Sequence, residues 1–490
     1  MPGSRTREGN LAVVLTASGG AFLAMLDSTV VSLAIPAVKH DFTSASVTGL
    51  SWIISAYAVT FAAFLAPSGK LADGLGRRRL FVIGIGLFTL ASLLCALSPS
   101  LPLLITARAL QGAGAAAMIP ASLAILLLDG PADRRHHSIG LWTAASAAGA
   151  ALGPAVGGAL IELSSWRAVF IINIPFGIFM VIAALRLLDA PGKASASRLP
   201  DPLATALIAL GVGALTLGVT EGGTWGWHST RTLACFVFGL AAMVYALLRS
   251  RRQPVPAVDM SLWSSRTYRT ANVVMMLYGM AQYSFMLAGV LYMTGIWRYS
   301  ELQAGLANSP GAVSAAIVAV GMGRLAPKLG GPRFATLFGL VVFGACATWM
   351  TFGLPVHPAF ASFWLPAGFL AGIGMGATTM GVSASAALSA PPVMFASASG
   401  LNTAARQFGG ALGIAVMATI LEHASPGHGG TEGYRQVFAC CAGLVALAFV
   451  VSVIWLRLAA ARPAPVPAAE PAGTASVPSP AGIEGAPAAD

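Results

Sequence analysis

The sequence has little charge and few cysteines. Only 9% of its 490 residues are Asp, Glu, Lys or Arg, whereas soluble domains average about 25%. Because 56% of the residues are apolar, this composition excludes a soluble globular protein and indicates that lipid surrounds most of the chain. All five cysteines lie in apolar runs, so we expect them to be small core residues, without a disulfide framework.

Motifs for nucleotides and metals are also missing. Each of the four lysines is followed by His, Leu or Ala, so the Gly-x-x-x-x-Gly-Lys-Ser/Thr loop of an ATP-driven pump is absent. The seven histidines include no His-Glu-x-x-His pattern, which disfavours a metal-dependent or hydrolytic enzyme. We therefore expect no enzymatic activity, no cofactor and no metal site.

Long apolar stretches dominate what is present. A helix that crosses the bilayer needs about 20 mostly apolar residues, and the short connections carry Pro, Gly, Asn and Ser, as helical hairpins do. We predict an all-α polytopic membrane protein with fourteen transmembrane helices. The predicted spans are 11–35, 48–68, 80–98, 102–127, 138–161, 168–188, 203–220, 232–250, 270–294, 308–326, 334–352, 361–387, 400–421 and 436–457.

The positive charges predict the orientation of these spans. The net charge is +11, which by itself would also suit a nucleic-acid-binding protein. With the N-terminus in the cytoplasm, 21 of the 28 Lys and Arg residues fall on the cytoplasmic side, where basic residues near span ends are retained. We therefore predict a multi-pass protein of the cytoplasmic membrane with both termini in the cytoplasm, and no nucleic-acid partner.

An internal repeat divides the chain. Residues 69–79 and 323–333 align without a gap as Gly/Leu/Arg-rich loops, at an offset of 254 residues or eight helix-plus-loop units. Duplicated helical bundles are typical of secondary transporters. We predict a six-helix bundle (1–190), two inserted helices (191–255), a second six-helix bundle (256–458) and a disordered Ala/Pro-rich tail (459–490).

Asp27 is the only acidic residue well inside a predicted span, because Glu162, Glu221 and Glu422 lie near helix ends. A carboxylate in hydrocarbon is costly and usually faces a cavity or a partner. From the 1.5 Å rise per residue, Arg108 lies at a similar depth. We expect Arg108 to pair with Asp27 and to release it when the helices move or substrate intervenes, so that Asp27 binds a proton in competition with substrate; a purely structural ion pair or polar helix contact is the alternative.

Several motifs together resemble the major facilitator superfamily, and within it the fourteen-helix branch of drug:proton antiporters. They include Leu26–Val31 in the first span, Arg108–Gly114 in the fourth, Trp166–Gly177 at the start of the sixth and Asn402–Gly410 in the thirteenth. The resemblance implies that the first and fourth spans line a central cavity and that the arginine of the fourth takes part in proton transfer.

The resemblance also implies conformational roles for two glycine-containing motifs. In the first repeat loop we expect a latch that forms in one access state, with Asp73 pairing locally with Arg77 or Arg78 and also with helix ends across the bundle; a solvated basic anchor is the alternative. Glycines recurring every four residues in the fifth span are expected to pack against another helix, a pattern that Gly368, Gly372 and Gly376 repeat in the twelfth. The expected gating residues are Gly69, Asp73, Gly76, Arg77, Arg78, Gly149, Gly153, Pro154, Gly157 and Gly158.

Polar residues inside the spans are candidates for the substrate cavity. Arg406 either faces that cavity or extends to the membrane interface, and Tyr283 belongs to a Met- and aromatic-rich run that forms either a binding wall or ordinary packing. The candidate cavity residues are Gln111, Asn402, Arg406, Gln407 and Tyr283. We predict proton-coupled export of a small hydrophobic drug or antibiotic by a monomer; a metabolite importer and a non-transporting sensor or scaffold are the alternatives.

Overall fold

The computed structural model describes residues 5–43, 47–128, 134–188, 200–253, 256–257, 260–423 and 430–456. Within this part, fourteen spans are long and apolar enough to cross a membrane, which confirms the predicted number. The predicted tail lies outside the described residues. The helices are α1 (Arg5–Asp41), α2 (Val47–Leu75), α3 (Arg77–Ala96), α4 (Leu101–Leu128), α5 (Arg135–Leu163), α6 (Ala168–Ile171), α7 (Asn173–Leu187), α8 (Pro202–Trp225), α9 (Thr230–Ser250), α10 (Met260–Ser264), α11 (Arg266–Gly295), α12 (Glu301–Leu325), α13 (Pro332–Gly353), α14 (Leu365–Leu388), α15 (Phe395–His423) and α16 (Glu432–Trp455).

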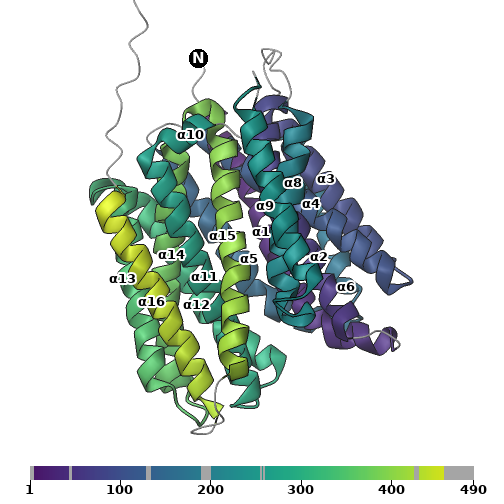
Figure 1. The fold of residues 1–490 in the computed structure, drawn as a ribbon, viewed down its shortest axis with the longest axis vertical. Helices are drawn as coiled ribbons and strands as arrows, with labels where there is room; N and C mark the ends of the chain where they lie inside the picture. The colour runs from purple at the N-terminus through teal and green to yellow at the C-terminus, as the bar shows by residue number, and fades with distance from the viewer. Residues whose placement is uncertain are drawn as a thin grey trace, which may run out of the picture. The chain divides into compact units, whose positions relative to one another are not determined.

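Three local features differ from a simple set of fourteen rods. The sixth span is divided between α6 and α7 at Ile172, and one π-helical turn, Phe360–Trp364, precedes α14. The short α10 precedes α11 near the end of the bundle that carries the N-terminus (Figure 1). Serine caps begin α9, α11 and α12, where Ser229, Ser265 and Ser300 each accept a backbone N–H bond, as helix starts require.

Helix packing repeats along the chain. In the first half α1 contacts α5, α2 contacts α4 and α3 contacts α4; in the second half α11 contacts α15, α12 contacts α14 and α13 contacts α14. The offset of 254 residues relates each pair to its counterpart. The halves meet through α5 with α12 and through α15 with α2, which are again equivalent pairs. We call these two interfaces the α5/α12 seam and the α2/α15 seam.

The two additional helices lie at only one of these seams. The α8 helix contacts α2, α15 and α9, and Figure 1 shows α8 and α9 in front of the bundle between α15 and the N-terminal helices. An ion pair between Asp201 and Arg249 joins the start of α8 to the end of α9. The hydrogen bonds from Arg249 hold the pKa of Asp201 below its usual range. The ion pair therefore holds α8 and α9 together, and α8 contacts both halves of the protein.

Glycines let helix backbones approach each other closely within each half. A Cβ atom at Gly149 of α5 would lie 2.3 Å from the carbonyl oxygen of Phe22 on α1, and one at Gly153 would lie 1.8 Å from Thr29 Oγ1. The predicted packing of Gly149, Gly153 and Gly157 against another helix is confirmed, and Gly158 faces Leu302 of α12 in the other half. Only the backbone is described at Pro154, where α5 continues as a single helix.

The expected close packing in the twelfth span is confirmed, although its neighbour is not the repeat equivalent of α1. Gly372 and Gly376 of α14 do pack against backbone, but on α12, which repeats the α2–α4 contact of the first half. The counterpart of α5 on α1 is α15 on α11, where Cβ atoms at Gly409 and Gly413 would lie 2.1 and 2.2 Å from backbone oxygens. Spacing alone revealed glycine stripes but not which neighbour each one meets.

The glycine contact between α5 and α1 gives a stability prediction. Gly149→Val is expected to lower the free energy of unfolding by about 1–3 kcal/mol, because the side chain would overlap backbone that cannot rotate away. Gly86→Val in α3 is the matched control, since a Cβ atom at Gly86 would meet nothing within 4 Å. The thermal unfolding midpoint of the purified protein in detergent measures the difference. Equal midpoints for the two variants would contradict this account of the contact.

Candidate functional site

Asp27 lies at the centre of a buried polar cluster inside the N-terminal half. Its Oδ2 accepts a hydrogen bond of 2.6 Å from Arg108 Nη1, and its Oδ1 accepts bonds from Gln111 Nε2 at 2.9 Å and Asn173 Nδ2 at 2.8 Å. The predicted proximity of Asp27 and Arg108 is confirmed, and both are 1% exposed. Since all three partners are donors, the arrangement fits the ionised carboxylate, which only accepts.

The environment of Arg108 holds the guanidinium in place. Its Nε donates to the backbone oxygen of Ile53 at 3.1 Å, its Nη1 also contacts Gln111 Oε1 at 2.6 Å, and its Cζ lies 4.4 Å above the ring of Tyr57. Charge-assisted hydrogen bonds and a cation–π contact offset the cost of burying the charge. The pair is thereby connected to α2 as well as to α1 and α4.

Two members of this cluster were not among the predicted site residues. Asn173, at the start of α7, and Ser92, on α3, complete the network, because Gln111 Nε2 also donates to Ser92 Oγ at 2.8 Å. Asn173 belongs to a motif already visible in the sequence. An asparagine inside an apolar span was the signal that could have identified it.

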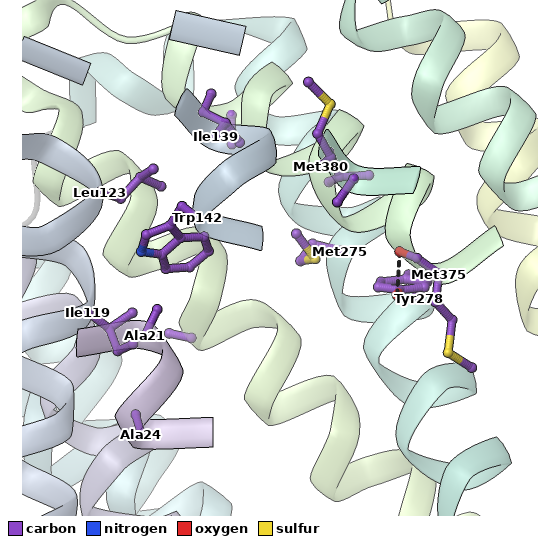
Figure 2. Close-up of a cluster of buried hydrophobic side chains, with 14 of the residues drawn as sticks. Ala21, Ala24, Ile119, Leu123, Ile139, Trp142, Met275, Tyr278, Met375 and Met380 are labelled. Carbon is purple, nitrogen blue, oxygen red and sulfur yellow. Dashed lines mark hydrogen bonds between the residues drawn. The ribbon is translucent and has the colours of Figure 1, made fainter. Parts of the chain in front are cut away.

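A cavity of about 220 Å³ lies between the two halves, against the middle of α1. Three polar or flexible α1 residues, Met25, Ser28 and Thr29, line it, whereas Asp27 itself is not in its wall. The other lining residues come from α5, α11, α12, α13, α14, α15 and the turn before α14. Figure 2 shows one wall residue on each side, Trp142 from α5 and Met375 from α14, whose carbonyl oxygen accepts a bond of 3.1 Å from Tyr278.

Two of the five predicted cavity residues line the cavity and three do not. Tyr283 and Arg406 line the cavity. Gln407 lies just behind, where its Oε1 accepts a hydrogen bond from the Tyr283 hydroxyl. Gln111 belongs to the Asp27 cluster, and Asn402 is buried against Asn272 on α11 at 3.4 Å, so neither is in the cavity wall.

Asp73 connects the halves at the end of the bundle that holds the α15 N-terminus. Its carboxylate accepts bonds from the backbone nitrogens of Ala396 at 3.2 Å and Ser397 at 2.9 Å, and from the Ser397 hydroxyl. An acid at a helix N-terminus satisfies free N–H groups and interacts favourably with the helix dipole. The expected contact with a helix end across the bundle is present, and its partner is α15.

The other latch residues have distinct places. A Cβ atom at Gly69 would lie 2.5 Å from the Ala396 oxygen on α15, so this glycine permits the approach of α2 to α15. Gly76 adopts a φ of 97° in the turn before α3, a conformation that favours glycine. Arg77 begins α3, and Arg78 Nη2 donates to the Leu185 oxygen on α7 at 2.6 Å.

A second acid is buried in the inserted hairpin. Glu221 lies in the last turn of α8, as its sequence position indicated, but it is only 2% exposed. It hydrogen-bonds Ser55 of α2, and its Oε2 atom has no partner among the described residues. Glu221 thus lies near a helix end, as predicted, and is nevertheless buried, because proximity to a helix end does not determine exposure within a bundle.

A cluster at the C-terminal end of α1 combines the exposed Asp41 with the buried Trp166. Asp41 Oδ2 accepts hydrogen bonds from Trp166 Nε1 at 2.8 Å and Arg167 Nη1 at 2.7 Å. These bonds, the one from Trp166 first, hold the pKa of Asp41 below its usual range. The contacts attach α1 to the start of the sixth span, so the two helices that supply Asp27 and Asn173 share an anchor.

Comparison with known proteins agrees with these features. A family model described as Major Facilitator Superfamily matches residues 17–265 and 271–485. The chain is 31% identical to the multidrug resistance protein Stp of Mycobacterium tuberculosis, covering 84% of this chain and 75% of the relative. It is 30% identical to a methylenomycin A resistance protein of Streptomyces coelicolor, covering 89% and 91%, and 32% identical to a cephamycin export protein of Amycolatopsis lactamdurans, covering 85% and 86%.

A solved structure shares the fold at low sequence identity. The crystal structure of the human organic anion transporter MFSD10 aligns with a TM-score of 0.66 and 16% identity, covering 90% of this chain and 99% of that one. The names of the sequence relatives agree with the drug-exporting branch that the motifs indicated, and the family is one of transporters. The protein is thus a multi-pass membrane protein that belongs to the Major Facilitator Superfamily.

Proposed function

We propose that the protein is a proton-coupled antiporter that exports small hydrophobic organic compounds, antibiotics among them, across the cytoplasmic membrane. The observation that carries the proposal is the division of α1 between two sites. Asp27 pairs with Arg108 on one side, while Met25, Ser28 and Thr29 line the cavity on the other. A proton and a substrate therefore act on one helix without sharing a binding place.

Coupling through α1 differs from the direct competition expected from the sequence. A proton that binds Asp27 neutralises the carboxylate to which Arg108 donates. The buried pair then separates, and α1 repacks against α4 and α7. Because neighbouring residues of α1 form part of the cavity wall, this repacking changes the substrate site. A proton that enters through 100 mV supplies about 2.3 kcal/mol, which is about fifty-fold in substrate concentration.

Alternating access follows from relative motion of the two halves. The six-helix bundles 1–190 and 256–458 rock about the cavity, with the hairpin within 191–255 seated beside them. Both termini face the cytoplasm, so the Asp73 contact with α15 links the two halves at the cytoplasmic end. The cavity, the proton site and both seams are formed within one chain, which supports a functional monomer.

The exporting direction is favoured over import and over a sensor role. The relatives above carry names for resistance or export, and a cavity at the interface of two repeated bundles is where secondary transporters bind substrate. Neither observation supports a non-transporting scaffold. One assay tests the direction of transport, the coupling to protons and the orientation of the protein in the membrane.

Uptake into inside-out membrane vesicles tests this function. Vesicles that contain the full chain are energised to an acidic and positive interior, and methylenomycin A, a cephamycin, tetracenomycin C and ethidium are offered in turn. We expect accumulation of at least one compound that collapses when a protonophore is added. Vesicles without the protein give the background, and the absence of gradient-dependent accumulation for every compound would refute the proposal.

A further inference from the structure

The charge of the cavity wall is the starting point for a statement about substrates. Of all the residues that line the cavity, Arg406 of α15 alone carries a charge, and no lining residue is acidic. Most of the rest of the wall is methionine, phenylalanine, tryptophan, alanine and glycine. A single cation in a largely apolar and acid-free cavity attracts anions and repels cations.

Arg406 has no acidic partner within the part of the chain that is described. The ion pairs found there join Asp27 to Arg108, Asp41 to Arg167 and His40, and Asp201 to Arg249. Arginines inside a membrane normally pair with an acid or a ligand, because an unpaired charge in low dielectric is costly. The missing counter-charge is one that a ligand can bring.

The backbone that carries Arg406 is held firmly. A Cβ atom at Gly279 of α11 would lie 2.4 Å from the Arg406 carbonyl oxygen, so the two helices touch at this residue. Its neighbour Gln407 is bonded to the Tyr283 hydroxyl, and Tyr283 is itself part of the wall. The start of the side chain is therefore fixed, as preorganised recognition of a ligand requires.

The cavity also offers a second polar contact. Gln282 lines the wall, and its Oε1 atom is buried without a partner among the described residues. The rest of this part of the wall is apolar, and Met286, Trp364 and Met375 provide an adaptable surface there. The volume of about 220 Å³ lies below the ~300–1,000 Å³ usual for drug-sized ligands, which favours compact compounds.

We propose that the cavity selects hydrophobic organic monoanions, whose carboxylate or similar group pairs with the Arg406 guanidinium while the hydrocarbon part lies against the Met- and Trp-containing wall. This inference rests on the proposed function in treating the bound compound as the transported one. Charge-assisted bonds from a guanidinium to a carboxylate supply the discrimination. Export of such an anion carries one negative charge outward in addition to the charge of the protons that enter.

Equilibrium binding to the purified full-length protein tests the selectivity without any proton gradient. The probes are 1-naphthaleneacetate and its neutral carboxamide, which share one hydrocarbon skeleton, and quenching of tryptophan fluorescence reports binding because Trp142 and Trp364 line the cavity. We expect the acid to bind at least about tenfold more tightly than the amide at neutral pH, a difference of about 1.4 kcal/mol.

Substitutions assign this preference to one side chain. Arg406→Gln is expected to make the two affinities equal, and Arg406→Lys to keep part of the preference, because the charge remains without the planar fork. Arg333→Gln, on the exposed start of α13 where the side chain bonds the Val453 oxygen, is the control and should keep the full preference. Gel filtration and thermal unfolding establish that each variant is folded.

Three results would overturn the inference: equal affinity of the wild-type protein for acid and amide, no binding of the acid at millimolar concentration, or an acid preference that survives in Arg406→Gln. The proposed function fails separately. If no compound is accumulated in energised vesicles while the acid preference and its loss in Arg406→Gln persist, antiport is refuted and the anion site stands.

Discussion

Asp27→Asn is expected to abolish proton-driven accumulation of substrate, reducing it more than tenfold, while leaving gradient-independent exchange of substrate in place. The reason is that the asparagine cannot take up and release a proton, and the proton site lies outside the cavity wall. Uphill accumulation and substrate counterflow in proteoliposomes separate these two activities.

The buried position of the pair calls for two controls. Removing one partner of a buried ion pair leaves the other charge uncompensated and costs about 3–5 kcal/mol, so Asp27→Asn is compared with the double variant Asp27→Asn/Arg108→Gln, in which neither charge remains. Asp41→Asn, at the exposed end of the same helix, should accumulate substrate like the wild type. Proton-driven accumulation at the wild-type level in both Asp27 variants would show that another group carries the proton.

Gly69→Ala is expected to cause the second large loss, a reduction of transport by about tenfold or more with little effect on folding. A Cβ atom at this position would lie 2.5 Å from the Ala396 backbone oxygen, so α2 and α15 cannot approach as they do here. The state with this end closed is disfavoured, and each 1.4 kcal/mol of destabilisation changes its population tenfold. Spin labels on the adjacent ends of α2 and α15 should show a longer distance distribution.

Two further variants make this prediction specific to the seam. Gly74→Ala is the matched control in the same loop, since its Cβ atom would meet only Pro200 at 3.9 Å, and wild-type transport is expected. Asp73→Ala removes the cap on the α15 N-terminus, which costs about 0.5–2 kcal/mol, and should move the distance distribution in the same direction as Gly69→Ala. Unchanged spin-label distances in both variants would show that the α2/α15 seam does not open and close during transport.

The sequence predicted the elements well because hydropathy and glycine spacing are local signals. Hydropathy predicts the fourteen spans that the described residues show, and the helical rise predicts a common depth for Asp27 and Arg108, which lie 2.6 Å apart. The repeat offset also anticipated the matching of helix pairs between halves. Each of these inferences needs only position along a helix of known geometry.

What the sequence could not predict depends on which faces meet. The partners of Asp73 lie 323 and 324 residues away, and spacing contains no information about which helix start an acid will cap. The same limit explains why Gln111 is predicted in the cavity although it faces Asp27, and why the glycine spacing in α14 does not identify α12 as its neighbour. Rotation of a helix about its axis is determined by all of its neighbours together.

The position of α8 makes the two seams unequal toward the lipid. At the α2/α15 seam, α8 contacts both helices and α9 covers α8, whereas among the described helices no comparable pair covers the α5/α12 seam. A compound dissolved in the bilayer therefore meets α5 and α12 directly on one side of the molecule, and an inserted hairpin on the other. The two sides of the molecule that face lipid are therefore unequal, even though the protein is built from two equivalent bundles.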